Sequence, residues 1–370
     1  MNPHDHPTKT ERQRRVDFDT LAPLSIGALV VAVIAIAIAI ASHQETGTVK
    51  AAPAGSAGST PTADGYGSEG SASTEPVKDV KPDFSAKQIN PATEPVKAGP
   101  KTFELTATER KIKVGDKVYD QWTFNDQVPG PVMRVVVGDK VTIKIKNAGD
   151  SKLPHSVDYH SSRLTLGGGH VQVNPGETGT FEFTAEYPGV FMYHCATAPV
   201  LHHIGMGMYG MMIVQPKEGF GADMPEYAIV QHELYASSKG IDEGVMDAMA
   251  FNGIPAHYTK MPIKVKKDAT IRMFVLNAGP SQVSSFHVVG TVFDKVLDDG
   301  NPRNLSYGRQ ALMIPASGSG VFEFKTVGEG LFPFVTHQFN HAAKGAIGMI
   351  IAGDGKPGPG AIDEAKDGHH

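Results

Sequence analysis

Short apolar runs alternate with polar and turn-forming residues along most of the chain after Thr102. In VMRVVVGDKVTIKIKNAG, for example, hydrophobic residues recur at every second position after a Gly-Asp pair. GETGTFEFTAEYPGVFMYH has the same character, with aromatic residues and Val between Gly and Pro. A period of two indicates strands with one buried face, and many short strands separated by turns are typical of β-sandwiches and barrels. The pattern therefore predicts an all-β fold for this part of the chain.

Two stretches of this β pattern are repeated further along the chain. VVVGDKVTIKIKNAG at 135–149 is echoed by IKVKKDATIRMFVLNAG at 263–279. VNPGETGTFEFTAEYPGVFMYHC at 173–195 is echoed by IPASGSGVFEFKTVGEGLFPFVTHQ at 314–338. An internal repeat indicates duplication of a structural unit, and the chain's 370 residues suit two domains of ordinary size. We predict two related β-domains, with bounds at 100–217 and 218–353.

The chain before residue 100 has a different character. Residues 21–41 carry no charge, and as a helix of roughly 30 Å they are long enough to cross a bilayer. Basic residues within 1–20 predict a cytoplasmic N-terminus and a single-pass cell-membrane protein with extracytoplasmic β-domains. A cleaved signal peptide is the alternative, because Ala37-Ile38-Ala39 is a small-x-small site. Residues 42–99 and 354–370 lack apolar periodicity and are predicted to be a disordered linker and a flexible tail.

Charge and cysteine content narrow the range of functions. The formal net charge is −5, so no basic excess is available for a phosphate backbone, and nucleic acid is excluded as a partner. Cys195 is the only cysteine, so no intrachain disulfide can form despite the predicted oxidising location. It is either an inert buried thiol or a metal ligand.

The two repeats differ in the residues that can bind a metal. LPHSVDYH and MYHCA of the first copy match SFHVVGTV and VTHQF of the second. The matched pairs are His155 with His287, Asp158 with Gly290, His160 with Val292, His194 with His337, and Cys195 with Gln338. A copper–thiolate site is therefore predicted in the first copy alone.

A blue-copper centre combines two imidazoles and a thiolate with a weak axial ligand, commonly Met. His155 and Cys195 supply one imidazole and the thiolate. The loop CATAPVLHHIGMGM offers His202 or His203 as the second imidazole and Met206 or Met208 as the axial thioether. The residues thus predict a site that can relay single electrons.

A second metal site is predicted beside the first. Adjacent strand residues point to opposite faces, so Cys195 can hold one metal inside the domain while His194 presents its imidazole outward. His160 supplies a second imidazole, and the repeat places His337 on an inter-domain or inter-subunit surface as the third. Three histidines on a polar interface without a metal are the alternative.

These motifs together resemble the copper-containing nitrite reductase family over about residues 101–352. The resemblance is carried by PGP in QVPGPVMRVVVGD, H-x-x-D-x-H in HSVDYH, the LGGGH-VQVNPGE segment, the His-Cys pair and the final VTHQF. It implies two tandem cupredoxin-like, Greek-key β-sandwich domains assembled into a homotrimer. It further implies nitrite as the substrate and an external one-electron donor, either a blue-copper protein or a cytochrome.

The resemblance also implies a role for each candidate residue. Asp158 matches the acid that hydrogen-bonds nitrite and delivers a proton. The implied type 1 copper ligands are His155, Cys195, His203 and Met208. The implied type 2 copper ligands are His160 and His194 of one subunit with His337 of the next.

One departure from the family pattern bears on activity. The family has a second catalytic histidine in the second domain near HVVGTVFD, and this sequence places Val292 there. His287 is interpreted as a retained buried histidine and His341 as a residue at the rim. Without the second histidine, a membrane-tethered blue-copper electron carrier is the alternative function. A two-domain multicopper oxidase is a further one, although Ala196 replaces the second histidine of an H-C-H motif.

Overall fold

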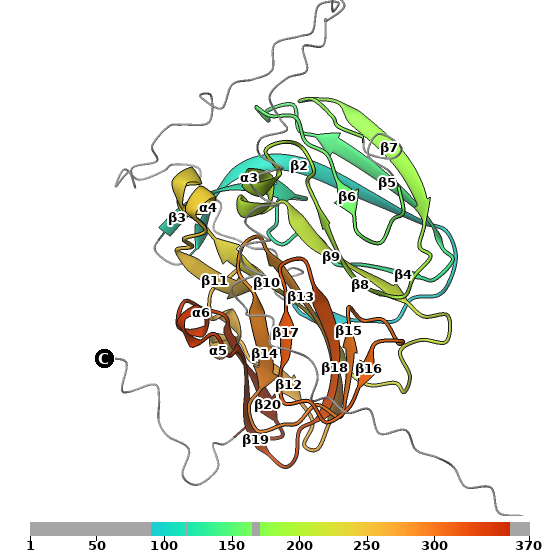
Figure 1. Ribbon diagram of the computed structural model, residues 1–370, viewed down its shortest axis with the longest axis vertical. Coiled ribbons are helices and arrows are strands. Elements are labelled where there is room, and N and C mark those ends of the chain that lie inside the picture. Colours follow the sequence, from blue (N-terminus) through green and yellow to red (C-terminus); the bar gives the residue numbers. More distant parts are fainter. Residues whose placement is uncertain (1–89, 115–116, 165–170, 356–370) are drawn as a thin grey trace, which may run out of the picture. The chain divides into compact units, whose positions relative to one another are not determined.

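The computed structural model describes residues 90–114, 117–164 and 171–355, which form two β-sandwiches in chain order (Figure 1). Strands β2 to β9, coloured cyan to green, build the first, and β10 to β20, yellow to red, build the second. The prediction of a mainly β fold is confirmed. The predicted segments 1–20 and 21–41 lie outside the described residues, as do most of the linker and of the tail. Among the described helices, none combines the length and hydropathy that a bilayer span requires.

The first sandwich packs the sheet β3-β2-β5-β7 against the sheet β4-β9-β8-β6. The strands are β2 Lys101–Val114, β3 Lys117–Phe124, β4 Met133–Val136, β5 Lys140–Asn147, β6 Asp158–Tyr159, β7 Thr178–Thr184, β8 Gly189–His194 and β9 Tyr209–Gln215. In β5, buried Val141, Ile143 and Ile145 alternate with lysines and a threonine that are exposed or half-buried, as the sequence pattern predicts. Cys195 and Met208 belong to the core between these sheets. The candidate thiolate is therefore part of the packed interior.

The second sandwich repeats this layered arrangement with more strands. Its sheets have the orders β1-β10-β13-β18-β15-β16, with β11 paired to β10, and β12-β20-β19-β14-β17. The strands are β1 Ala92–Thr93, β10 Glu226–Leu234, β11 Ala248–Phe251, β12 Ile263–Val265, β13 Thr270–Gly279, β14 Ser284–Val288, β15 Lys295–Asp298, β16 Leu305–Ser306, β17 Leu312–Ile314, β18 Ser319–Lys325, β19 Gly330–Thr336 and β20 Ile347–Ala352. Aromatic side chains, among them Phe286, Phe322 and Phe334, fill its core.

The helices of the described chain are short and lie between strands. They are α3 Val200–Gly205, α4 Ser238–Glu243, α5 His257–Lys260 and α6 Phe339–Ala343. At the start of α4 the Ser237 hydroxyl accepts a hydrogen bond from Gly240 N at 3.1 Å, and the helix ends at Gly244 in the left-handed region. Helix α3 follows β8 and leads into β9, so it forms part of the loop that carries the histidine candidates.

Buried apolar side chains and charges join the two sandwiches. Met192 and Met211 of the first sandwich share a core cluster with Phe274 and Val321 of the second. Nearby, the carboxylate of Glu226 lies between two guanidinium groups. The contacts are Arg134 Nη1 to Glu226 Oε2 at 2.5 Å, Arg272 Nη1 to Glu226 Oε1, and Arg272 Nε to Glu323 Oε1 at 2.8 Å. Because Arg134 lies on β4 and Glu226 on β10, this network links the two sandwiches.

Substitution of Glu226 by Gln should destabilise the protein strongly. Its side chain is 3% exposed, and its loss of charge leaves two buried guanidinium groups poorly compensated. Removal of one partner from a buried ion pair typically costs about 3–5 kcal/mol in the free energy of unfolding. Chemical denaturation of the copper-loaded protein measures this cost. The matched control is Glu104→Gln, because Glu104 pairs with Lys144 at the surface and exposed pairs are worth only about 0–1 kcal/mol. Equal effects of the two substitutions would contradict the prediction.

Residues 90–99, which the sequence pattern assigns to the linker, contact both sandwiches instead. Ala92 and Thr93 form β1 and pair antiparallel with the start of β10. Gly99 N donates to Asp139 Oδ1 at 2.7 Å, and Ala228 N donates to the carbonyl oxygen of Pro91 at 2.7 Å. These contacts use backbone groups, so hydrophobic periodicity does not detect them. The predicted linker therefore overlaps the structured chain over these ten residues.

Candidate metal centres

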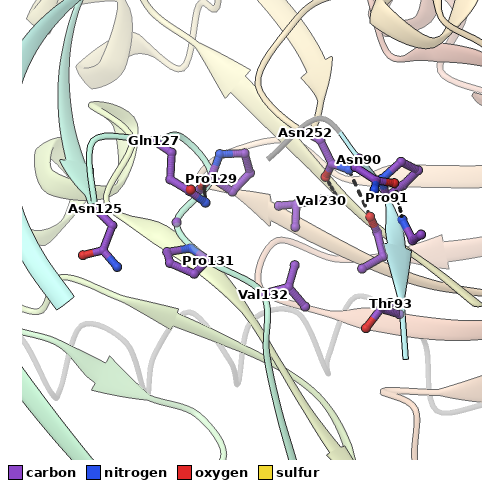
Figure 2. A pocket seen from close by; sticks show the side chains of 13 residues that line it. Asn90, Pro91, Thr93, Asn125, Gln127, Pro129, Pro131, Val132, Val230 and Asn252 are labelled. Carbon is purple, nitrogen blue, oxygen red and sulfur yellow. Dashed lines mark hydrogen bonds between the residues drawn. The ribbon is translucent and has the colours of Figure 1, made fainter. Parts of the chain in front are cut away.

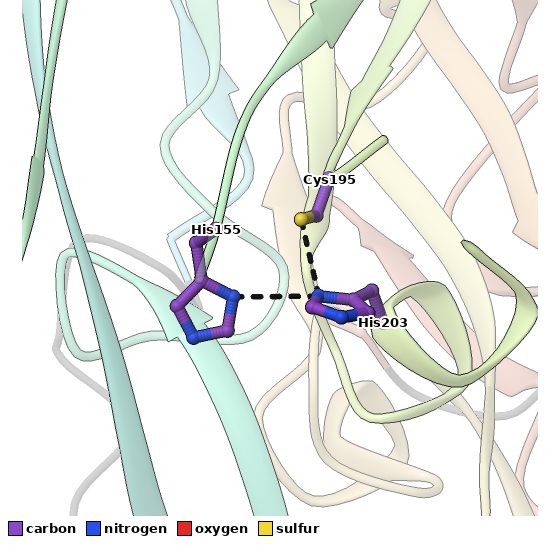
Figure 3. Close-up of side chains that lie close together, drawn as sticks. All are labelled: His155, Cys195 and His203. Carbon is purple, nitrogen blue, oxygen red and sulfur yellow. Dashed lines mark hydrogen bonds between the residues drawn. The ribbon is translucent and has the colours of Figure 1, made fainter. Parts of the chain in front are cut away.

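Three side chains that can bind a soft metal ion converge inside the first sandwich (Figure 3). His155 precedes β6, Cys195 directly follows β8, and His203 lies on α3. Cys195 Sγ lies 3.1 Å from His203 Nδ1, and the Nδ1 atoms of His155 and His203 are 3.3 Å apart. None of the three residues is more than 1% exposed. The arrangement is a compact, water-excluded set of two imidazoles and one thiol.

Backbone hydrogen bonds hold the ligand-bearing segments in place. His155 and Val173 exchange N–H to carbonyl bonds of 3.0 and 2.8 Å. Cys195 N donates to the carbonyl oxygen of Met208 at 3.0 Å, and Met208 N donates to that of His203 at 3.1 Å. The loop after Cys195 therefore closes on itself through α3 and returns His203 to the sulfur.

The structure separates the alternatives that the loop sequence leaves open. His202 points away from the cluster, because its Nε2 contacts Asp242 Oδ1 at 2.7 Å. Met208 is fully buried in the same core cluster as Cys195, whereas Met206 is half-buried and packs against the core of the second sandwich. His203 and Met208 are thus the residues that the fold brings to the side of Cys195.

The surroundings of Cys195 favour its thiolate. Burial raises the pKa of the thiol, but hydrogen bonds with His155 and His203 lower it further than burial raises it. Ser156 N also points at the sulfur, with N to Sγ at 3.4 Å. The pKa therefore lies well below the ordinary value for cysteine, and the thiolate is the form that binds metals.

Trp122 lies beside both imidazoles of the first cluster, and Glu109 lies beside that of His155. The Trp122 ring lies edge-on to both, with centroid distances of 5.9 Å to His155 and 4.7 Å to His203. Glu109 Oε1 lies 3.6 Å from His155 Nε2 and accepts hydrogen bonds from the backbone N–H groups of Lys152 and Leu153. Burial raises the pKa of Glu109, but His155 and the two N–H groups outweigh it and lower the pKa overall.

A second cluster contains Asp158, His160 and His194, whose ligand atoms lie within 4.8 Å of one another. Asp158 pairs directly with His194 between β6 and β8. The two imidazoles point at each other, with Nε2 to Nε2 at 3.0 Å, and Asp158 Oδ2 lies 3.9 Å from His194 Nε2. His194 Nδ1 lies 2.9 Å from the carbonyl oxygen of Cys195, which can only accept. This contact places the proton on Nδ1 and leaves the Nε2 lone pair for a metal.

The surroundings of His160 also favour its neutral imidazole. Partial loss of water around the ring lowers the pKa of His160, and the nearby His194 lowers it further, while Asp158 acts in the opposite direction. A neutral imidazole is the form that ligates metals. Two Nε2 atoms and a carboxylate at this spacing could serve together as ligands of one metal ion.

His337 does not belong to this cluster within the chain. It follows β19 and is exposed, and its ring is tilted against that of His287 and edge-on to that of Phe339, with ring centroids 5.0 and 4.8 Å away. Phe339 is 63% exposed. Val292 and Met313 are also exposed over more than half of their surface. An imidazole on an apolar surface is therefore available for contact with another molecule.

The structure corrects the expectations for His287 and His341. Phe286 and Val288 of β14 face the core, so strand alternation turns His287 outward beside His337, where it is half-buried. His341 lies on α6, is only 5% exposed, and its Nδ1 has no hydrogen-bond partner among the described residues. His287, and not His341, is thus the imidazole that accompanies His337 at the surface.

A cavity of about 610 Å³ lies apart from these clusters (Figure 2). Segment 90–93, the loop around Pro129 and residues of the second sandwich line it. The described residues that line it contribute amides, prolines and aliphatic side chains, and none of them is an acid, a base, a histidine or a cysteine. These described residues offer no group for redox or proton-transfer chemistry.

The first cluster fits copper by its donor set. Two converging Nδ1 atoms and one thiolate in a buried pocket, with a buried methionine beside them, match the kinds of ligand that a type 1 copper takes. The second cluster offers the imidazole nitrogens of a separate, more accessible metal. Cys195 and His194 are adjacent, so one peptide unit connects the two clusters.

Known proteins with similar sequences and structures indicate the class of protein to which this chain belongs. The sequence profile described as multicopper oxidase matches residues 106–219, which span both clusters. The copper-containing nitrite reductase of Neisseria meningitidis serogroup A is 37% identical over 281 residues, covering 72% of each chain. The solved copper nitrite reductase of Nitrosomonas europaea is 33% identical with a TM-score of 0.66, covering 69% of this chain and 94% of the other. That of Thermus scotoductus is 36% identical with a TM-score of 0.66, covering 69% and 62%.

The chain belongs to the copper-containing nitrite reductase family. It therefore has the cupredoxin-like fold of these relatives, and it is a copper oxidoreductase with type 1 and type 2 sites.

Sequence reasoning missed two residues around the sites and placed a third, His287, in the core instead of at the surface. Glu109 and Trp122 lie on β2 and β3 and reach His155 only because the sheets pack as they do. No motif marks either residue. His287 could have been found from the alternation in SSFHV, where flanking apolar residues take the inward positions.

Proposed function

We propose that the chain reduces nitrite to nitric oxide and water, consuming one electron and two protons. The observation that carries the proposal is the Cys195–His194 pair, which connects a buried thiolate cluster to an accessible imidazole cluster. Membership in the family supports it, because the relatives carry this activity in their names. When bound, copper at the first cluster supplies one-electron transfer, and copper at the second supplies a Lewis acid for nitrite.

The protein residues have separate tasks in this reaction. His155, Cys195, His203 and Met208 hold the electron-relay site away from water. His160 and His194 orient their Nε2 atoms toward the substrate-binding metal. Asp158 lies beside His194 and holds a proton for the departing oxygen of nitrite. The positions of the histidine nitrogens, the Cys195 sulfur and the Asp158 carboxylate support these roles.

A homotrimer is proposed because the second cluster needs a third imidazole. His337 is exposed, and Phe339 and Met313 present apolar surface of the kind that subunit interfaces cover. His337 of the partner subunit would complete the site of the first chain. His287 arrives with it, because their rings are 5.0 Å apart. His287 is therefore the proposed second proton-holding group, in place of the histidine whose position Val292 occupies.

The location and electron donor are also proposals. The uncharged run at 21–41 supports a single-pass anchor in the cell membrane with the β-domains outside. A flexible linker would keep the head near membrane-bound partners. A blue-copper protein or a cytochrome supplies electrons one at a time, as the first cluster requires.

Nitric oxide production from nitrite tests the function directly. Copper-loaded protein with a reduced one-electron donor, kept free of oxygen, should release nitric oxide well above the level of free copper. Asp158→Asn should slow the reaction about 10²–10⁴-fold, because an amide cannot deliver the proton. Asp120→Asn is the matched control, since Asp120 is exposed and pairs with Lys111 at the surface, and this variant should retain full activity. A fully loaded but inactive wild-type protein with a blue absorption band would favour the electron-carrier alternative.

A further inference from the structure

The remote nitrogen of His155 faces a carboxylate. His155 Nδ1 points into the cluster with Cys195 and His203, so its Nε2 carries the hydrogen when Nδ1 binds a metal. Within the described residues this Nε2 is buried without a hydrogen-bond partner, and Glu109 Oε1 lies 3.6 Å from it. The carboxylate is therefore the acidic group toward which the imidazole N–H points.

Glu109 is held in this position independently of His155. Its Oε1 accepts hydrogen bonds from Lys152 N at 2.8 Å and from Leu153 N at 3.0 Å. The Glu109 side chain is only 17% exposed, so water screens its charge weakly. Asn147 Nδ2 fixes the same loop from the other side by donating to the carbonyl oxygen of Leu153 at 2.7 Å. The negative charge thus has a fixed place next to the ring.

We propose that Glu109 is a positioning residue that orients His155 through its Nε2–H and lowers the reduction potential of the type 1 copper. The inference rests on the proposed assignment of that copper. A carboxylate that faces the remote N–H of a metal-binding imidazole makes that imidazole a stronger donor to the metal. A fixed negative charge near the metal also favours the oxidised state, which carries one more positive charge. Both effects act in the same direction.

A purely structural role for Glu109 predicts a different outcome. If the carboxylate only anchored the loop, an amide oxygen at the same place could still accept from Lys152 and Leu153. Glu109→Gln therefore preserves the anchor and removes the charge. Glu109→Asp keeps the charge but withdraws it by one methylene. Glu104→Gln is the matched control, because Glu104 is on the same strand and is 74% exposed.

The test is a redox titration of the blue absorption band in the copper-loaded protein. The expected order of midpoint potentials is wild type lowest, Glu109→Asp higher and Glu109→Gln highest, with Glu104→Gln equal to wild type. The electron spin signal of the copper should also change in Glu109→Gln and remain unchanged in the control. Equal potentials in all four proteins would overturn the inference.

The remaining outcomes are also decisive. If Glu109→Gln yields no blue protein, Glu109→Asp decides: a potential above that of Glu104→Gln supports the inference, and an equal one overturns it. A wild-type protein without a blue band would instead contradict the type 1 assignment. Failure of the inference and failure of the proposed function are therefore distinguishable.

Discussion

Cys195→Ser is expected to abolish both the blue colour of the copper-loaded protein and its nitrite reduction with a protein donor. The strong visible absorption of a type 1 site arises from the thiolate bond to copper, and a neutral serine hydroxyl is a poor ligand for that metal. Cys195 lies 3.1 Å from His203 and is the only cysteine of the chain, so no other thiol can take its place. Activity should fall to the level of copper-free protein.

The second cluster should survive this substitution. His160 and His194 keep their Nε2 atoms 3.0 Å apart, and the bond to residue 195 uses its backbone carbonyl. Cys195→Ser should therefore still bind a colourless copper with its own spin signal. His202→Ala is the matched control, because His202 contacts Asp242 instead of the cluster, and this variant should stay blue. A blue Cys195→Ser protein would remove the basis of the proposed function.

Much of the fold could be predicted because alternation reports burial on one face. The segments at 132–149 and 176–194 contain β4, β5, β7 and β8, and the repeated segments contain β13, β18 and β19. The same regularity gives the orientation of the His194–Cys195 pair, since neighbouring strand residues face opposite sides. Motif spacing in the sequence alone could therefore indicate two adjacent clusters of candidate metal ligands.

Contacts between distant strands could not be predicted in this way. Glu109 reaches His155 because β2 and the loop before β6 lie in one packed sandwich, and nothing in the sequence near Glu109 indicates it. Spacing also left His202 and His203 equivalent, since the choice depends on how α3 turns within its loop. The strand β1 pairs through backbone groups, which have no side-chain signature.

The two clusters differ in burial, and this difference suits them to different chemical tasks. The first is closed by the core and by Trp122, so it suits electron relay without a substrate. The second is partly open: His160 is exposed and Asp158 is half-buried. The described part of the chain supplies this cluster with two imidazoles and one carboxylate. If this cluster holds the proposed substrate-binding metal with His337 of a neighbouring chain, oligomer assembly is a condition of activity.

Mixed oligomers of His337→Ala and His160→Ala chains are therefore expected to regain activity that each variant lacks alone. In an oligomer made of one variant, every copy of the second cluster lacks one of its three proposed imidazoles. The buried Cys195 cluster stays intact in both variants. In a mixed ring, His160 and His194 of a His337→Ala chain can meet His337 of a His160→Ala chain. Random mixing of equal amounts in a closed, head-to-tail ring leaves about one quarter of the interfaces complete.

Co-expression with two affinity tags and purification on both tags isolates the mixed species, and nitric oxide release measures its activity. The dually purified oligomers should recover a substantial part of wild-type activity, whereas each variant co-expressed with a second tagged copy of itself should stay inactive. The matched control in the mixing experiment is His341→Ala. It also removes a histidine, but His341 lies on α6 and is buried, whereas His337 is exposed. It should not impair the recovery of activity. Mixed oligomers as inactive as their parents would mean that the third imidazole does not come from a neighbouring chain.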